Sequence, residues 1–152
     1  MAAITRLTSL LSKHRRIAID SSIFIYAFEE HRTYGEACAS VFEYSSTHEV
    51  ALMTSVISFS EILVQPVQKK DPEVIALYEN LFSTLPNFFL LDITRPVAKT
   101  AAYLRAAYSI LLSDAYQLAA PLHHGATLFI TNDKRLKKVQ ELSVVCLDDL
   151  VV

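Results

Sequence analysis

Glycine is scarce in this chain, with 2 residues among 152. That scarcity excludes the glycine-rich loops that cradle phosphates and the glycine fingerprints of dinucleotide-binding proteins. Cysteine is equally scarce. Cys38 and Cys146 lie far apart with no CxxC spacing, which argues against a disulfide scaffold or a zinc site. Each of them falls within an apolar pattern, so we expect both in the core.

Long apolar runs are also missing, although 52% of the residues are hydrophobic. None approaches the roughly 18 to 20 residues that a membrane-spanning helix needs. The apolar part of the first segment, MAAITRLTSLL, is too short for a signal peptide, and basic residues follow it. We therefore expect a cytoplasmic protein with no membrane partner. The net charge of −2 does not by itself indicate a nucleic-acid partner.

Short apolar segments alternate with helical patterns along the chain. Strands are expected at residues 16–20, 48–53, 88–91, 126–130 and 143–147. Helices are expected at 21–28, 32–45, 58–64, 71–83, 94–108 and 114–123, the last capped by Ser113, with a short helix or turn at 134–139. This alternation predicts a mostly parallel sheet covered by helices on both faces. Because no repeat or linker interrupts it, we expect residues 1–152 to form a single α/β domain.

Acidic residues recur where strands give way to helices. Four of them lie in or beside apolar stretches: Asp20, Glu61, Asp114 and Asp133. Desolvated carboxylates are costly, and several held together also repel one another. A divalent cation bound by all of them removes both costs, and carboxylates are ligands for Mg²⁺ and Mn²⁺. Ligand sites of open parallel sheets lie beyond the carboxyl ends of the strands, so we expect the acids to meet there.

Each of these acids also has a purely structural explanation. Asp20 and Asp114 suit the first turn of a helix, where a carboxylate caps amides or meets the helix dipole. Glu61 can close a capping box with Ser58, and Asp133 suits a turn. Caps do not require such junctions to recur along one edge of a sheet, whereas a cation does. A capping carboxylate also keeps lone pairs for a metal, so the two explanations are compatible.

The ordered set of acid contexts resembles the PIN-domain family, and within it the VapC-type toxin ribonucleases. A first strand that ends in Asp is matched by Asp20 in RIAIDSS, and a helical Glu after the second strand by Glu61 in SFSEIL. An Asp that opens a helix rich in small residues is matched by Asp114 in SDAYQLAA. A Thr-x-Asp segment is matched by Thr131-Asn132-Asp133. The resemblance covers residues 16 to 147, and residues 1–13 precede the family's usual start.

The resemblance implies a three-layer α/β/α fold with a mostly parallel central sheet of about five strands. It implies a Mg²⁺- or Mn²⁺-dependent endoribonuclease that cleaves single-stranded RNA with metal-activated water. The implied catalytic residues are Asp20, Glu61, Asp114 and Asp133, and the implied metal ligands are Asp20, Asp114 and Asp133. Ser22 and Thr131 would support the carboxylates. The resemblance further implies a homodimer and a small antitoxin protein as partner.

Two cations follow the last of these acids directly. Lys134 and Arg135 are candidate contacts to RNA phosphates, and a solvated helix face is the alternative explanation. The segment Leu111-Leu112-Ser113, where the family often has Pro or Gly, departs from the pattern.

Other functions fit the acids less well or stay open. A phosphatase of the haloacid dehalogenase type needs a second Asp two residues after the first, where this chain has Ser22. A phosphoryl-receiver domain needs adjacent acids after the first strand, and Ser21 follows Asp20. A non-toxin PIN protein that acts in RNA processing is an open alternative. So is a catalytically inactive module that binds RNA or a protein partner.

Overall fold

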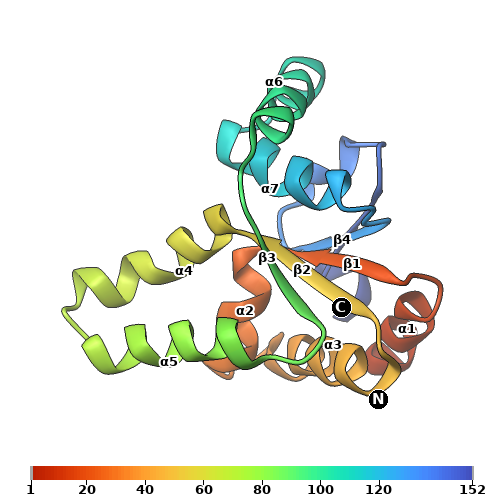
Figure 1. Cartoon of the computed structure of the whole chain (residues 1–152). Helices are drawn as coiled ribbons and strands as arrows, with labels where there is room; N and C mark the ends of the chain where they lie inside the picture. The colour runs from red at the N-terminus through yellow and green to blue at the C-terminus, as the bar shows by residue number, and fades with distance from the viewer. Residues whose placement is uncertain (1, 152) are drawn as a thin grey trace.

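A five-stranded parallel sheet lies at the centre of the computed structural model, which describes residues 2–151 (Figure 1). The strands are β1 (Arg16–Ile19), β2 (Ala51–Ser55), β3 (Phe88–Leu91), β4 (Leu128–Thr131) and β5 (Ser143–Cys146). Their order across the sheet is β3-β2-β1-β4-β5, and every neighbouring pair is parallel. The chain builds outward from β1 in one direction and then returns to build in the other. Such a switch point is where open parallel sheets bind ligands.

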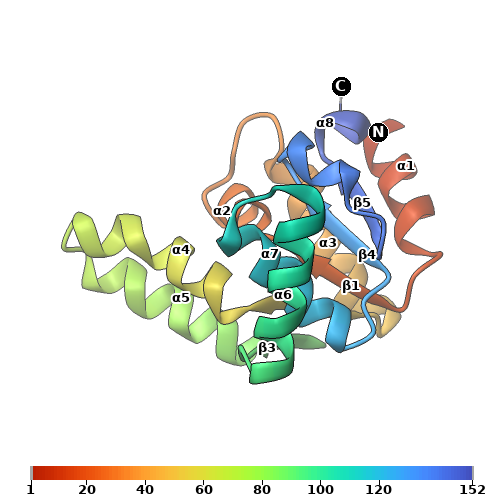
Figure 2. The same ribbon diagram turned by 90° about the horizontal axis from the view of Figure 1, so that it is seen from above.

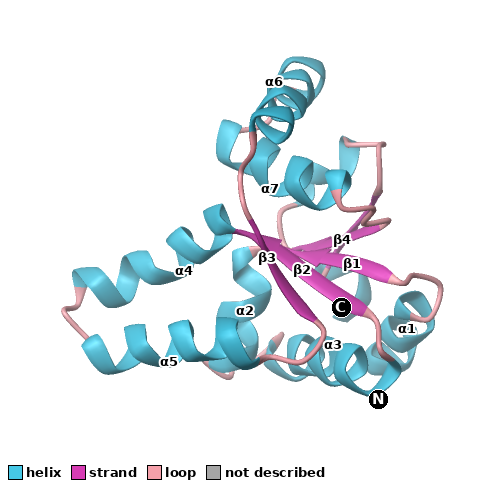
Figure 3. Cartoon of the chain, viewed as in Figure 1, coloured by secondary structure: helices cyan, strands magenta, loops and turns pink. Residues whose placement is uncertain are grey.

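Helices cover both faces of this sheet (Figures 1 and 3). They are α1 (Ala2–Leu11), α2 (Ser21–Phe28), α3 (Gly35–His48), α4 (Val56–Gln68), α5 (Pro72–Thr84), α6 (Arg95–Tyr108), α7 (Leu112–His123), the 3₁₀-helix η1 (Lys134–Lys138) and α8 (Asp148–Val151). The two faces of the sheet carry two hydrophobic clusters. One contains residues of α1, α2 and α3, and the other contains residues of α6 and α7. The predicted three-layer α/β/α fold is therefore confirmed.

Side-chain alternation along the central strand explains how one short strand serves both layers. Ile17 and Ile19 pack in the first cluster, while Ala18 between them packs in the second. All three are at most 1% exposed. The same alternation occurs in β4, where Leu128 and Ile130 face the first cluster and Phe129 the second. Strands buried on both faces appear in the sequence as continuous apolar runs, as expected for a parallel sheet.

Helices α4 and α5 form a hairpin that extends away from the sheet (Figures 1 and 2). Helix α4 follows β2 without a loop, and Ser55 caps it by accepting a hydrogen bond from the amide of Ile57 at 3.2 Å. The predicted capping box of Ser58 and Glu61 is therefore wrong, because the helix begins earlier than expected. Pro66 lies inside the last turn of this helix.

Several other predicted boundaries also shift in the structure. Residue 48 ends α3 instead of beginning a strand, and β2 starts at Ala51. Helix α7 begins at Leu112 with Leu111 as its N-cap and no side-chain hydrogen bond there, so Ser113 is not the cap. Asp114 lies in the first turn of α7, as predicted. The expected α6 is confirmed almost to the residue, with the Thr94 hydroxyl accepting from the amide of Val97.

The N-terminal segment, to which the sequence assigned no role, forms α1 over residues 2–11. Leu7 and Leu11 are each 1% exposed, and the helix packs against α3 and α8. It therefore completes the first hydrophobic cluster. Cys38 and Cys146 are both buried free thiols, as expected. Within residues 2–151, none of the helices combines the length and apolar character needed to cross a bilayer.

Candidate active site

One cavity of about 270 Å³ lies at the carboxyl edge of the sheet, beside the switch point. All four acids singled out in the sequence line it: Asp20, Glu61, Asp114 and Asp133. Each comes from a different part of the fold, since they follow β1, lie on α4, open α7 and follow β4, respectively. The expected convergence of these acids on one edge is therefore what the structure shows. The remaining lining residues are Ser21, Ser22, Tyr26, Gln117 and Asn132.

Asp20 is the most buried of the acids, with 8% of its surface exposed. It caps α2 by accepting from the amide of Ser22 at 3.0 Å, and it also accepts from the hydroxyls of Ser22 and Thr131. Burial raises the pKa of Asp20 to about 6, although these donors pull the pKa down. The carboxylate is thus held by neutral donors, and within the described residues no cation offsets its desolvation. Ser22 and Thr131, expected to support the carboxylates, are therefore both hydrogen-bonded to Asp20, and their role in the reaction stays a prediction.

Thr131 joins two of the acids through one hydroxyl. Its Oγ1 donates to Asp20 and accepts from the backbone amide of Asp133 at 3.0 Å. Because Thr131 is the last residue of β4 and is fully buried, its hydroxyl has little freedom. A buried side chain at the end of a strand therefore holds Asp20 and Asp133 in place relative to each other.

Glu61 is held from two sides by residues that sequence reasoning did not select. The Gln117 amide donates Nε2 to Glu61 Oε1 at 2.6 Å, and the Ser21 hydroxyl donates to Oε2 at 2.9 Å. Gln117 is 4% exposed. The only available signal was its position, one helical turn after Asp114 in a run of small apolar residues, where a polar side chain needs a partner.

The pKa of Asp114 is affected by burial and by the charges of the other acids. Its pKa is raised first by burial, and then by the negative charges of Asp133 and Glu61. This repulsion places the carboxylates within electrostatic range of one another, as the cation hypothesis requires.

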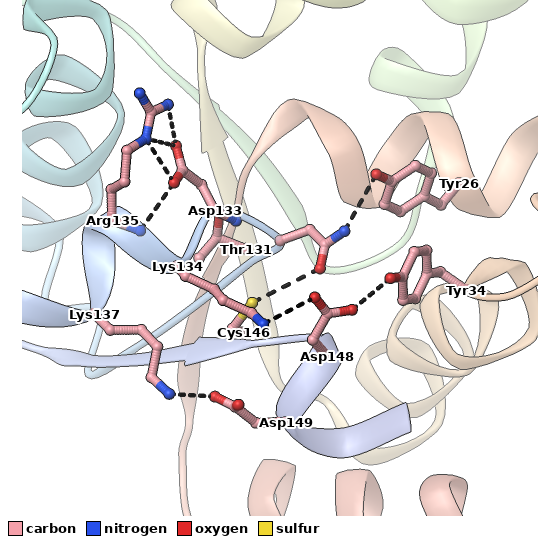
Figure 4. A network of polar contacts seen from close by, with 11 residues as sticks. Tyr26, Tyr34, Thr131, Asp133, Lys134, Arg135, Lys137, Cys146, Asp148 and Asp149 are labelled. Carbon is pink, nitrogen blue, oxygen red and sulfur yellow. Dashed lines mark hydrogen bonds and ion pairs between the residues drawn. The ribbon is translucent and has the colours of Figure 1, made fainter. Parts of the chain in front are cut away.

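Asp133 is paired with a cation inside the protein. Arg135 places its guanidinium across both carboxylate oxygens, with Nε 3.0 Å from Oδ1 and Nη2 2.6 Å from Oδ2 (Figure 4). These hydrogen bonds hold the pKa of Asp133 below its ordinary value. Such a forked pair is the strong geometry for arginine and a carboxylate. The guanidinium therefore contacts both oxygens of Asp133.

The donors around the cavity suit a hard divalent ion, because carboxylates predominate and amide and hydroxyl oxygens accompany them. The raised pKa of Asp20 and the repulsion felt by Asp114 are both relieved by a bound cation. In the described arrangement, however, no three His, Cys, Asp or Glu side chains among residues 2–151 stand together as a ready metal-binding group. The four acids share a cavity, but Asp20, Glu61 and Asp133 are each hydrogen-bonded to protein donors.

The two predicted RNA contacts lie differently. Lys134 pairs with Asp148 of α8 at 3.5 Å and does not line the cavity. Arg135 lies at the cavity's border through its pair with Asp133. Figure 4 shows these neighbouring side chains directed to different sides of η1.

Comparison with known proteins agrees with this geometry. The family model described as PIN domain matches residues 17–142. No curated protein matches the chain in sequence. Solved structures do match: VapBC2 from Rickettsia felis bound to a DNA fragment from their promoter aligns with a TM-score of 0.69 at 16% identity, over 86% of this chain and 97% of that one.

Two further structures share the fold. DNA-bound VapBC from Salmonella typhimurium aligns with a TM-score of 0.68 at 14% identity, over 87% of this chain and 98% of that one. A toxin–antitoxin complex from Klebsiella pneumoniae aligns with a TM-score of 0.57 at 22% identity, over 86% and 97%. At these identities the structural likeness concerns the fold, whereas the family model covers most of the sequence. The chain belongs to the PIN domain family, as its acid contexts indicated.

Proposed function

We propose that this protein is a divalent-metal-dependent endoribonuclease of the PIN type that cleaves single-stranded RNA in the cytoplasm. The observation that carries the proposal is the meeting of four acids, from four separate elements, in one cavity at the switch point of the sheet. Caps alone would explain each acid but not their common cavity. Among residues 2–151 no cation offsets the burial of Asp20, so its raised pKa favours a metal over a purely structural role.

In this proposal Asp20, Asp114 and Asp133 hold Mg²⁺ or Mn²⁺. A bound divalent ion neutralises charge on the phosphate and makes water more acidic. Glu61 accepts the proton of the attacking water, or holds the ion through a water, and Gln117 and Ser21 keep its two oxygens in place. Attack by water then leaves a 5′-phosphate and a 3′-hydroxyl.

We further propose that the protein is the toxin of a VapBC-like pair, that it forms a homodimer, and that a small antitoxin binds it. The support is that the matching solved structures are toxin–antitoxin complexes. A catalytically inactive RNA- or partner-binding module is the second candidate. The observation that favours it is the Arg135 guanidinium on Asp133, together with the lack of a ready metal-binding group among residues 2–151.

The first test substitutes Asp20→Asn and Asp114→Asn and measures cleavage of a labelled single-stranded RNA with Mg²⁺ or Mn²⁺. Each variant should lose at least about 100-fold in rate, because each removes a charge that the metal needs. Asp92→Asn is the matched control, since Asp92 is exposed and lies outside the cavity. Circular dichroism should show all variants folded. Full activity in either cavity variant contradicts the nuclease proposal, as does a wild-type protein that cleaves no RNA with either metal.

A further inference from the structure

The basic segment that follows Asp133 is sorted into three faces by the geometry of η1. A 3₁₀-helix has three residues per turn, so side chains three positions apart lie on the same side. Leu136 and Val139 form one such pair, and both are buried, at 2% and 3% exposure. They anchor the segment to the second hydrophobic cluster. The other two faces therefore carry the four basic residues of η1, which are Lys134, Arg135, Lys137 and Lys138.

The second face is neutralised by α8. Lys134 lies 3.5 Å from Asp148, and Lys137 lies 2.5 Å from Asp149 (Figure 4). Tyr34 donates a further hydrogen bond to Asp148. These two lysines therefore tie η1 to the C-terminal helix, and their charges are already matched within the protein.

The third face carries Arg135 and Lys138, and it borders the candidate active site. Both side chains line a hollow of about 90 Å³ whose other wall is the α6–α7 connection, residues 109–111. Asp114 lines this hollow and the acid cavity alike, so the two are direct neighbours. Among residues 2–151, Lys138 has no carboxylate within ion-pair distance. Within the described part of the chain, Lys138 is thus a cation that shares a hollow with Asp114 and has no ion-pair partner.

We propose that this hollow binds a backbone phosphate of the RNA next to the one that is cleaved, with Lys138 as its ligand and Arg135, paired with Asp133, in its wall. The inference rests on the proposed function. The hollow is small and partly walled by Ile110, Leu111 and Leu136, and apolar walls strengthen a charge–charge contact. Arginine and lysine are the side chains that hold phosphates in nucleic-acid complexes. A strand whose cleaved phosphate lies at Asp114 would pass directly from one cavity into the other.

The test compares Lys138→Ala with Lys137→Ala, two variants of neighbouring residues in one helix that remove the same charge. Steady-state cleavage of a labelled single-stranded RNA is measured with Mg²⁺ at several salt concentrations. Lys138→Ala should raise KM about five- to tenfold, as expected for one charge-assisted contact. It should leave kcat near the wild-type value. Lys137→Ala should change neither constant, because its charge serves Asp149.

A second measurement follows binding directly. Fluorescence anisotropy with the same RNA, in protein that also carries Asp20→Asn to prevent cleavage, gives the dependence of affinity on salt. Lys138→Ala should reduce the slope of log K against log salt by about 0.7, the value of one phosphate contact on a single strand. Lys137→Ala should leave the slope unchanged.

The outcomes separate this inference from the proposed function. If the wild-type protein cleaves RNA but Lys138→Ala has unchanged KM and salt dependence, the phosphate site is wrong and the nuclease stands. If Lys137→Ala weakens binding as much as Lys138→Ala, general electrostatic attraction replaces a specific site, and the inference is again overturned. If the wild-type protein cleaves no RNA, the proposed function itself fails.

Discussion

Glu61 lies on an exposed stretch of α4, yet its carboxylate is positioned by two other helices. Ser21 at the start of α2 and Gln117 within α7 donate to its two oxygens. Gln117 is buried, and Glu61 is the partner that its amide nitrogen finds. A buried amide costs free energy unless it is hydrogen-bonded. Here the hydrogen bond also fixes the orientation of the Glu61 carboxylate. We infer that Gln117 positions Glu61 and does not itself act on the substrate.

Gln117→Met tests this role, because methionine has similar volume and no hydrogen-bonding amide. The rate of RNA cleavage at saturating RNA should fall about 10- to 100-fold, as for the loss of a hydrogen bond that orients a site carboxylate. The KM for RNA should stay near the wild-type value. The exposed Gln65 provides the control, and Gln65→Met should behave as wild type.

A double-mutant cycle distinguishes positioning from packing. In a Glu61→Ala background, Gln117→Met should cause little further loss, because the group that it orients is gone. Additive losses would mean that Gln117 acts elsewhere, and the positioning role would be abandoned.

Single residues were predictable where their role is local. Asp20 and Asp133 stand at the ends of strands, and the alternation of apolar and helical segments was enough to place them on one edge. Gln117 and the pairing of Arg135 with Asp133 were not predictable, for different reasons. The first depends on a contact across 56 positions of sequence. The second depends on η1 turning as a 3₁₀-helix, which the basic sequence does not specify.

At the scale of elements, the start of α4 shows how two similar serines differ. Ser55 ends β2 and caps the helix, whereas Ser58 lies in its first turn with a fully buried hydroxyl. Within residues 2–151, the Oγ of Ser58 is the buried side-chain polar atom that has no hydrogen-bond partner. An unsatisfied buried hydroxyl costs about 1–3 kcal/mol.

Substitution of these serines should have opposite effects. Ser58→Ala should raise the free energy of unfolding by about 1 kcal/mol, because it removes the unsatisfied hydroxyl. Ser55→Ala should lower it by about 1 kcal/mol, because it removes an N-cap. Urea unfolding measures both. A destabilised Ser58→Ala variant would show that this hydroxyl has a partner in solution, such as a buried water.

The misplaced boundary between α3 and β2 has a physical cause in the scarcity of glycine. Helix ends usually adopt a left-handed residue, and glycine marks it in the sequence. Here the left-handed positions at the ends of α3 and α6 are Glu49 and Ser109, with φ of 53° and 55°. Neither residue signals a helix end. The expected strand at 48–53 therefore began too early. At the end of α7, by contrast, the left-handed residue is a glycine, Gly125, with φ of 78°.

At the scale of the whole molecule, the order of the strands brings acids that are distant in sequence to one edge of the sheet. β1 and β4 are neighbours although more than a hundred residues separate them. Asp20 follows β1 directly, and Asp133 lies two positions after the end of β4. α4 and α7 then bring Glu61 and Asp114 to the same edge. The alternating pattern predicted the parallel sheet and its acid-bearing edge, but not the order of the strands. That order depends on packing between distant segments, which a single sequence does not display.

The free energy of unfolding should depend on pH because Asp20 is buried among these acids. Burial raises the pKa of Asp20 from 3.8 to about 6, so the folded protein binds this proton more tightly than the unfolded chain does. Ionising Asp20 therefore costs stability. The cost is absent below about pH 4, grows as the pH rises to about 6, and is constant above that. A divalent ion on the carboxylate would remove it, because the charge would then be compensated.

Thermal unfolding of wild type and Asp20→Asn across pH 4 to 8 checks this linkage. Without metal, Asp20→Asn should be more stable than wild type by about 2 kcal/mol at pH 7.5, and the difference should vanish toward pH 4. Mn²⁺ should raise the Tm of wild type at pH 7.5 more than at pH 5, where protons compete for the carboxylate. It should leave Asp20→Asn unchanged, whereas Asp92→Asn should respond as wild type. An equal Mn²⁺ effect on wild type and Asp20→Asn would place the ion away from this cavity.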